Sequence, residues 1–343
     1  MNLLVTGGAG FIGSAFVRLA LATQPGTRVI NLDKLTYAGN LENLEPVAGH
    51  KDYRFVRGDI GDQAMVEALL AEEKIDAIVH FAAESHVDRS ILSSKPFVET
   101  NVLGTLSLLD AARKAKLGRF VLVSTDEVYG DIDAPHEADE QFPLRASSPY
   151  SASKAGADLL ALSYVRTFGM NLSVTRASNN YGPYQFPEKL IPLMILNALE
   201  GKNLPVYGDG QNIRDWLYVE DHCRAIEAVL ERGRPGEEYN IGGDAERTNL
   251  AVVHGICDLV DQLRPGLPHA PCRSKIAYVK DRPGHDRRYA IDASKIQSEL
   301  GWQPLENFET GIERTVRWYL ANSPWIERVT SGKYRRERLG LNA

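Results

Sequence analysis

The sequence TGGAGFIG at residues 6–13 constrains the fold more than any other part of the chain. It follows a short apolar run that begins at Asn2, and it precedes a segment with the spacing of a helix. Glycines at Gly7, Gly10 and Gly13 permit a tight turn and let the backbone approach a pyrophosphate closely. The N-terminus of the following helix offers N–H groups and a positive dipole end to phosphates. The motif therefore predicts a dinucleotide site at the start of a parallel α/β sheet.

The first half of the chain alternates short apolar runs with helical patterns. Runs that are apolar throughout are typical of parallel strands covered on both faces. We expect strands at residues 2–6, 28–32, 53–57, 77–81, 120–124 and 172–176, with helices that include 11–22 and 63–72. This alternation predicts a Rossmann-type α/β fold, which is a doubly wound parallel sheet.

The sequence pattern changes after Asn180. Glycine, proline and tyrosine punctuate it, so turns and short elements are expected there. We predict a dinucleotide-binding domain over residues 1–180 and a smaller substrate-binding domain mainly over 181–343. Part of 213–250 is expected to return to the first domain. The tail at 334–343 is basic and polar, and we assign it no function.

Composition excludes several classes of partner. The 343 residues are 43% hydrophobic and 24% charged, which is ordinary for a globular protein, and the net charge of −6 gives no general attraction to nucleic acid or an anionic membrane. No apolar run reaches the roughly 20 residues of a membrane helix, and no basic leader precedes the first strand. The three cysteines have no metal-ligand spacing. We expect reduced thiols, no metal and a cytoplasmic location.

An acidic residue, Asp33, stands twenty residues after Gly13, at the end of the second expected strand. A carboxylate there can accept hydrogen bonds from both hydroxyls of a ribose, and it would repel a 2′-phosphate. The strand, turn, helix and acid agree with a nicotinamide dinucleotide, and they favour NAD over NADP.

Tyr150 and Lys154 form a YxxxK pair in SPYSASKAGADLL, directly after Pro149 at the start of a helical run. The i, i+4 spacing puts both side chains on one helix face. An ammonium beside a phenol favours the phenolate, so we expect the pKa of Tyr150 to be lowered. The pair can then take a proton from a hydroxyl while hydride leaves the same carbon. YxxxK is frequent by chance, and a solvated helix face is the plain alternative.

The segment STDEVYG at residues 124–130 follows the fifth expected strand, at the edge where ligands bind in this fold. Thr125, Asp126 and Glu127 are adjacent there. Two neighbouring carboxylates can hold different protonation states, one as an acid and one as a base. A solvated acidic turn is the alternative, and its place at a strand end argues against it.

Together these residues resemble the extended short-chain dehydrogenase/reductase family, and within it the nucleotide-sugar dehydratases. The similarity covers most of the chain and is carried by the blocks TGGAGFIG, LDKLTYAGNLENL, HFAAESHVDRSI, STDEVYG, YSASK, NNYGPYQFPEKLIP, YGDGQNIRDWLYVEDHC and DRPGHDRRY. The Thr-Asp-Glu sequence is the discriminating feature, because UDP-galactose 4-epimerases of the same family lack the acidic pair.

The resemblance implies an NAD-dependent hydro-lyase that converts dTDP-glucose to dTDP-4-keto-6-deoxyglucose in deoxysugar biosynthesis. Tyr150, aided by Lys154, takes the proton of the sugar 4-hydroxyl while NAD accepts hydride from C4. Glu127 then removes the C5 proton and Asp126 protonates the departing 6-hydroxyl, while Thr125 bonds the 4-oxygen. Hydride returns to C6. A homodimer is also implied.

Two sets of binding residues follow from the resemblance. Besides Tyr150 and Lys154, those expected around NAD are Gly7, Gly10, Phe11, Ile12, Gly13, Asp33, Lys34, Leu35, Thr36, Asp59, Ile60, Phe81, Ala82, Ala83, Ser85, Thr100 and Asn180. Those expected around the nucleotide sugar are Ser85, Thr125, Asn179, Lys189, Leu190, Pro205, Tyr207, Arg214, Asn249, Arg282 and His285. A lysine and arginines suit a pyrophosphate, which a guanidinium can grip with two hydrogen bonds.

Several alternatives stay open. Arg214 can instead pair with Asp215 or Glu220 at the surface, and His285 and His222 can be structural histidines. The same fold can carry a 4-epimerase or a decarboxylase that acts on a UDP-sugar. It can also carry a catalytically silent NAD-binding scaffold, against which the complete catalytic set argues.

Overall fold

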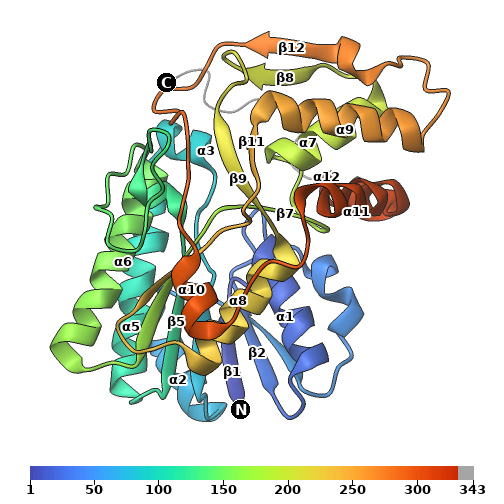
Figure 1. Cartoon of the computed structure of the whole chain (residues 1–343). Helices are drawn as coiled ribbons and strands as arrows, with labels where there is room; N and C mark the ends of the chain where they lie inside the picture. Colours follow the sequence, from blue (N-terminus) through green and yellow to red (C-terminus); the bar gives the residue numbers. More distant parts are fainter. Residues whose placement is uncertain (331–343) are drawn as a thin grey trace.

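A parallel sheet of seven strands forms the centre of the protein, whose computed structural model describes residues 1–330 (Figure 1). The strand order is β10-β6-β5-β4-β1-β2-β3. The strands are β1 (Asn2–Thr6), β2 (Arg28–Asp33), β3 (Tyr53–Arg57), β4 (Ala77–His80), β5 (Arg119–Thr125), β6 (Leu172–Ala177) and β10 (Glu238–Ile241). The order reverses at β1, which pairs with both β2 and β4. Ligands bind beyond the carboxyl ends of the strands at such a switch point.

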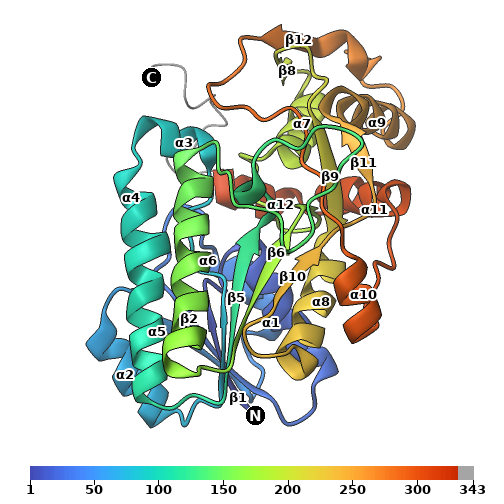
Figure 2. The ribbon, with the colours of Figure 1, turned by 60° about the vertical axis from the view of Figure 1, so that its left-hand side comes forward.

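Helices cover both faces of this sheet (Figures 1 and 2). One face carries α1 (Phe11–Thr23), α8 (Val219–Arg232) and α10 (Ser294–Leu300), and the other carries α2 (Gln63–Glu72), α5 (Thr105–Lys114) and α6 (Pro149–Phe168). Successive strand residues alternate between the two cores, as the pleat requires. Leu3 and Val5 pack towards α1, whereas Leu4 packs towards α2, and all three are fully buried.

Short elements connect the sheet to its helices near the carboxyl edge. They are η1 (Leu41–Val47), α3 (Val87–Leu92), α4 (Lys95–Phe97), the π-helix η2 (Val98–Gly104) and the 3₁₀ turn η3 (Asp126–Tyr129). The helix α6 has a capping box at Ser148, whose side chain accepts from Ser151 N, and it has proline at its first position. This start is strongly specified, and it fixes where Tyr150 and Lys154 emerge.

A second group of elements lies beyond the carboxyl edge of the sheet (Figure 1). Its helices are α7 (Leu190–Glu200), α9 (Asn249–Leu263), α11 (Phe308–Ala321) and α12 (Ser323–Thr330), with a short turn η4 (Cys272–Lys275). Its strands are β7 (Asn179–Tyr181), β8 (Leu204–Tyr207), β9 (Ile213–Tyr218), β11 (Glu246–Thr248) and β12 (Ile276–Val279). These elements share a separate apolar core around Ile195, Val253 and Tyr319.

The predicted fold class is confirmed, because the parallel sheet is covered by helices on both faces. All six predicted strands are present, with ends that differ by at most one residue. The seventh strand, β10, was missed because its sequence EYNI has no continuous apolar run. The domain boundary at residue 180 stays a prediction, and the tail at 334–343 lies outside the described residues. Within residues 1–330, no helix has the length and apolar character needed to cross a membrane.

Candidate active site

A cavity of about 520 Å³ lies at the carboxyl edge of the sheet and extends to α7, β8 and residues 282–285. It collects the residues expected at the site: all of them line it except Leu35. The side chain of Leu35 packs against the core beside α1, while its backbone N–H donates to Asp33 Oδ1 at 2.7 Å. The two sets expected around a dinucleotide and a sugar nucleotide therefore share one continuous space.

The glycine-rich turn leaves room that side chains would fill. Gly7 has a φ of +72°, and a Cβ there would lie 2.5 Å from Ala82 N. A Cβ at Gly13 would lie 2.3 Å from Gly7 O, so this position too excludes any larger residue. Gly10 precedes α1, and no side chain of residues 1–330 caps that helix. The open helix N-terminus at the cavity wall fits a phosphate group.

The Asp33 carboxylate is held firmly at the end of β2. It is 8% exposed, and its Oδ2 accepts from Ala9 N at 2.9 Å while its Oδ1 accepts from Leu35 N at 2.7 Å. A carboxylate can accept about four hydrogen bonds, so acceptor capacity remains for ribose hydroxyls. Lys34 Nζ lies 2.5 Å from Asp59 Oδ2 in the same wall. This arrangement fits the non-phosphorylated ribose of NAD.

Thr125 and Asp126 form the strand end that faces the cavity. Thr125 Oγ1 donates to Asp126 Oδ1 at 3.2 Å, and the Asp126 side chain is almost completely buried. Burial raises the pKa of Asp126 well above its ordinary value, and the charges of Glu127 and Asp215 raise it further. Asp126 Oδ2 has no hydrogen-bond partner among residues 1–330. Its environment therefore favours the protonated acid.

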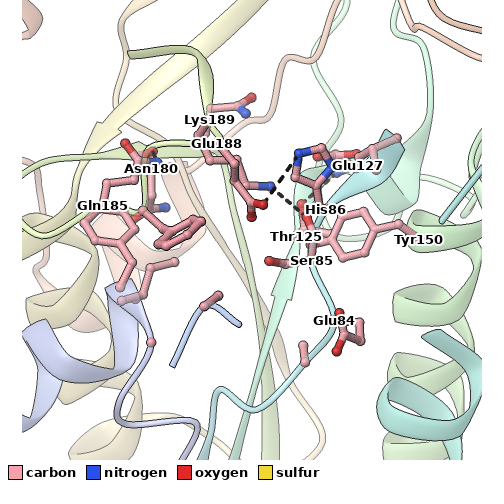
Figure 3. Close-up of a pocket in the computed structure, with 18 of the residues that line it drawn as sticks. Glu84, Ser85, His86, Thr125, Glu127, Tyr150, Asn180, Gln185, Glu188 and Lys189 are labelled. Carbon is pink, nitrogen blue, oxygen red and sulfur yellow. Dashed lines mark hydrogen bonds and ion pairs between the residues drawn. The ribbon is translucent and has the colours of Figure 1, made fainter. Parts of the chain in front are cut away.

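The neighbouring Glu127 has a different electrostatic environment. Burial raises its pKa as well, but the nearby charges of Arg282, Lys189 and Arg214 lower it. These cations stabilise the Glu127 carboxylate, whereas Asp126 is next to a like charge. Asp126 is thus the more readily protonated of the two, as an acid and base pair requires. Thr125 and Glu127 lie on the side of the cavity that also carries Tyr150 (Figure 3).

Tyr150 and Lys154 project from the first two turns of α6, and both are buried. Lys154 Nζ donates to Val123 O at 2.8 Å. Burial lowers the pKa of Lys154 to about 8, although the charge of Asp158 raises it. Burial also raises the pKa of Tyr150, and the charge of Glu127 adds to this effect. The expected lowering of the Tyr150 pKa is therefore wrong for this structure, because burial and nearby carboxylates raise that pKa.

Arg214, on β9, is a buried cation without an acidic partner. Its Nη2 donates to Asp286 O at 2.9 Å, and its Cζ lies 4.0 Å from the centroid of the Tyr289 ring. No carboxylate in residues 1–330 forms an ion pair with it, and Asp215 instead accepts two backbone N–H bonds. The alternative of a surface pair with Asp215 or Glu220 is therefore wrong. A desolvated guanidinium that lines a cavity is suited to bind an anion.

The other cations are fixed by local contacts. Lys189 Nζ donates to Ser85 O at 2.8 Å. Arg282 Nη1 lies 3.1 Å from Asp88 Oδ1, whose other oxygen accepts from the Tyr207 hydroxyl at 2.9 Å. Asp88 therefore joins the loop that contains Arg282 to β8, and all three residues line the cavity.

Several polar residues that line the cavity were missed by sequence reasoning. They are Glu84, His86, Asp88, Gln185 and Glu188, and they lie within the blocks HFAAESHVDRSI and NNYGPYQFPEKLIP. Figure 3 shows Glu188 beside Lys189 and across from His86, and Glu188 Oε2 lies 3.8 Å from His86 Nε2. Their place next to predicted residues in the same blocks was the only available signal. His222 also lines the cavity, and its Nδ1 lies 2.9 Å from Asn180 Oδ1.

The fold and the site define a class of nucleotide-sugar-modifying enzyme. A family model described as GDP-mannose 4,6 dehydratase matches residues 4–315, so the chain belongs to that family. Its relatives carry a narrower name. The dTDP-glucose 4,6-dehydratase of Xanthomonas campestris pv. campestris (strain B100) is 56% identical, with 98% of each chain covered.

Solved structures agree with this assignment. The dTDP-glucose 4,6-dehydratase of Streptomyces venezuelae, with NAD and TYD bound, is 52% identical and has a TM-score of 0.91 over 96% of this chain and 100% of that one. The UDP-glucose 4-epimerase of Thermotoga maritima is more distant. It is 29% identical, with a TM-score of 0.84 over 94% of this chain and 99% of that one. The resemblance to nucleotide-sugar dehydratases is thereby confirmed.

Proposed function

We infer that this chain catalyses the NAD-dependent dehydration of dTDP-glucose to dTDP-4-keto-6-deoxyglucose, a hydro-lyase reaction of deoxysugar biosynthesis. One observation carries the inference: a buried acid, Asp126, and a half-buried base, Glu127, line the same cavity as Tyr150 and Lys154. The names of relatives more than half identical to the chain support the same reaction.

The residues that line the glycine-rich turn and the end of β2 are proposed to hold NAD. Gly10 and the N-terminus of α1 would face its pyrophosphate, and Asp33 would accept from its ribose hydroxyls. When bound, NAD supplies reversible redox chemistry, first at C4 of the sugar and then at C6. All proton transfers are left to side chains of the protein.

We assign C4 oxidation to Tyr150 and Lys154, which we call the oxidation pair. The Tyr150 hydroxyl interacts with that of Thr125, and both would meet the sugar 4-oxygen. Tyr150 acts as the phenolate, which the Lys154 ammonium stabilises, and it becomes the neutral phenol when it takes the proton of the 4-hydroxyl. The raised pKa of Tyr150 means that the chain alone disfavours the phenolate. Proton uptake therefore depends on the arrangement completed by the bound cofactor and sugar.

We assign the loss of water to Asp126 and Glu127, which we call the elimination pair. Oxidation at C4 acidifies the C5 proton, and Glu127 removes it; burial raises the pKa of Glu127, but three nearby cations stabilise its carboxylate. Asp126 keeps a proton because of its burial, and it delivers this proton to the departing 6-hydroxyl. Glu127 then returns a proton to C5 after C6 has been reduced.

The sugar nucleotide is proposed to lie between the sheet and the second group of elements. Arg214 and Lys189 would neutralise its pyrophosphate, since both line the cavity and the hydrogen bonds of the Arg214 guanidinium within residues 1–330 go to backbone carbonyls. Residues 1–180 with α8 and β10 would then form the NAD-binding domain. The remaining residues would mainly bind the sugar nucleotide.

A 4-epimerase is the second candidate, because the epimerase of Thermotoga maritima shares the fold. Epimerisation needs the oxidation pair but no acid for a leaving hydroxyl. The burial and raised pKa of Asp126 would serve no purpose in that reaction, so dehydration explains the site better.

We also propose that the protein is a cytoplasmic homodimer. Val98 and Leu103 on η2 and Leu159 on α6 are about half exposed, at 47%, 51% and 58%, which is unusual for apolar side chains on neighbouring helices. The three cysteines are unpaired thiols, as expected in a reducing compartment. Leu159→Glu should shift the mass measured by light scattering from two chains to one, and an unchanged mass would refute this interface.

The proposed reaction is tested by incubating the purified protein with NAD and dTDP-glucose and measuring the mass of the product. Loss of one water supports dehydration, whereas an unchanged mass with galactose formed identifies the epimerase.

A further inference from the structure

A fully buried arginine, Arg176 on β6, lies behind the site and does not line the cavity. All three of its guanidinium nitrogens have partners. Nε donates to Asp158 Oδ2 at 2.9 Å, Nη1 donates to the Tyr129 hydroxyl at 2.8 Å, and Nη2 lies 2.6 Å from Glu238 Oε2. A guanidinium has a rigid planar fork of donors, so these three partners hold it in one orientation.

The first partner, Asp158, belongs to the helix that carries the oxidation pair. It follows Lys154 by one turn of α6, on the same helix face, and it is completely buried. Its charge is the one that opposes the lowered pKa of Lys154. The Arg176 contact therefore anchors α6 directly below the ammonium.

The second partner, Tyr129, belongs to the turn that carries the elimination pair. It ends η3, two residues after Glu127, and only 1% of it is exposed. Its hydroxyl accepts from Arg176 and donates to Asn240 Oδ1 at 2.8 Å. One arginine thus joins the helix of the first pair to the turn of the second.

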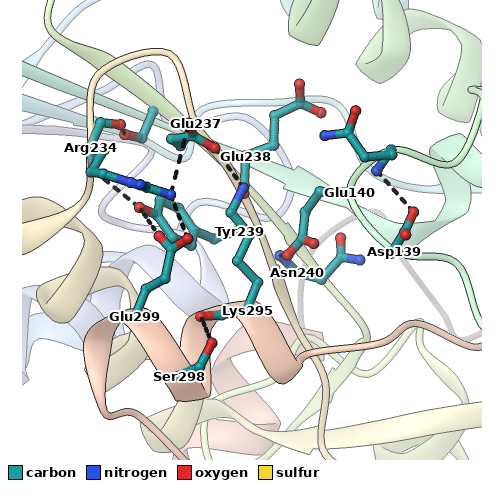
Figure 4. Close-up of polar contacts among 12 residues, drawn as sticks. Asp139, Glu140, Arg234, Glu237, Glu238, Tyr239, Asn240, Lys295, Ser298 and Glu299 are labelled. Atoms are coloured by element: carbon teal, nitrogen blue, oxygen red, sulfur yellow. Dashed lines mark hydrogen bonds and ion pairs between the residues drawn. The ribbon is translucent and has the colours of Figure 1, made fainter.

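Asn240 on β10 supports this arrangement from the edge of the sheet. Its backbone N–H donates to Glu140 Oε1 at 2.8 Å, and its side-chain amide donates to Ala138 O at 2.9 Å. Figure 4 shows Glu140 beside Asn240, while the neighbouring Tyr239 lies with Glu299 on the other side of the strand. The network is largely buried, and its hydrogen bonds join Arg176, Tyr129 and Asn240 in one chain, which makes it rigid; Asp158 Oδ1 alone in this network has no hydrogen-bond partner among residues 1–330.

We propose that Arg176 is a positioning residue that fixes the oxidation pair relative to the elimination pair. It touches neither substrate nor cofactor; it acts by clamping Asp158 and Tyr129. The proposal rests on the proposed function, because it assigns the two pairs to successive steps at one sugar. Both steps need side chains placed to within a fraction of an ångström, and a 1 Å error can cost about 10²-fold in rate.

The test uses Tyr129→Phe, which keeps the ring and removes only the hydroxyl shared by Arg176 and Asn240. Replacing Arg176 itself would leave the buried carboxylates Asp158 and Glu238 unpaired, and the chain would be at risk of unfolding. Without the Tyr129 hydroxyl, the turn that carries the elimination pair loses its hydrogen bonds to Arg176 and Asn240 and should shift. The helix α6 keeps its contact with Arg176 through Asp158. In a single turnover with dTDP-glucose, C4 oxidation should stay near the wild-type rate and water loss should slow by about tenfold or more. Reduced nicotinamide should accumulate transiently.

Two comparisons make the result decisive. Asp158→Asn weakens the contact between Arg176 and α6, so it should slow C4 oxidation instead of water loss. Reduced nicotinamide should then not accumulate. Tyr239→Phe is the matched control: its ring is equally buried, and its hydroxyl bonds Glu299 and Arg234 N on the far side of β10. In Tyr239→Phe, C4 oxidation and water loss should both run at wild-type rates, and Tm should fall by about as much as in Tyr129→Phe.

The proposal is overturned if Tyr129→Phe slows both steps equally, or slows water loss no more than Tyr239→Phe does. It is also overturned if Asp158→Asn and Tyr129→Phe affect the same step. A wild-type protein that releases no water would reject the proposed function itself, and the positioning role would fall with it. A wild type that dehydrates while the variants show no split rejects the positioning role alone.

Discussion

Replacing Asp126 by asparagine removes the proposed acid with the least change of shape. The side chain is almost completely buried, and its Oδ1 accepts from Thr125 Oγ1 at 3.2 Å, a bond that an asparagine carbonyl can also accept. What is lost is the proton that burial and the charge of Glu127 keep on the carboxyl group. A positioned general acid contributes about 10²–10⁴-fold, or about 3–5 kcal/mol in the barrier for water loss.

The oxidation step should survive the same substitution. Tyr150 and Lys154 lie on α6 and make no hydrogen bond to Asp126 within residues 1–330. Asp126→Asn should therefore oxidise C4 at close to the wild-type rate and then stall, with reduced nicotinamide accumulating.

The assay is a single turnover monitored by nicotinamide absorbance. Samples of the reaction are quenched at intervals, and the mass of the sugar nucleotide is measured by mass spectrometry. Tyr150→Phe is the matched contrast, because it should suppress the absorbance as well as the loss of water. If Asp126→Asn released water at the wild-type rate, Asp126 would be a bystander and the assignment of the elimination pair would be wrong.

Three further predictions follow from the same geometry. Lys154 carries its charge only below its pKa, so kcat/KM should fall as pH rises through about 8, and a flat profile there would remove Lys154 from the oxidation pair. Arg214→Ala should raise KM for dTDP-glucose far more than it lowers kcat, because the charge meets the pyrophosphate and not the reacting carbons; a fall in kcat alone would contradict this. Gly7→Ala should lower Tm by more than Gly26→Ala in thermal unfolding. Both positions have positive φ, which costs about 1–2 kcal/mol, but only at Gly7 would the new Cβ meet backbone, 2.5 Å from Ala82 N. An equal fall in Tm for the two variants would show that the contact between the new Cβ and Ala82 N costs no stability.

The sheet could be predicted because strands such as β1 and β5 contain continuous apolar runs, LLV and FVLV, and its first turn has a specific glycine pattern. Residues 2–6 and 53–57 were assigned with the bounds that the structure has. The strand β10 escaped, because EYNI alternates polar and apolar residues and its place beside β6 depends on contacts distant in the sequence. Local pattern says little about such a strand.

The site residues could be named from motifs, but their electrostatics could not. The sequence puts Lys154 four residues after Tyr150, which suggests a lowered phenol pKa; burial of both groups and the nearness of Glu127 reverse the direction. Arg214 in NIRDW has an acidic neighbour in the sequence, yet the strand turns Asp215 to the opposite side, where it accepts backbone N–H bonds. Burial and partner choice are properties of the folded chain.

The central claim is that this chain removes water from dTDP-glucose, and a panel of sugar nucleotides tests it most directly. The purified protein is incubated with NAD and with dTDP-, UDP-, CDP- and GDP-hexoses in parallel, and each product is weighed. We predict the loss of one water, with the highest kcat/KM for dTDP-glucose and no net formation of NADH. Products of unchanged mass from every sugar nucleotide would contradict the account.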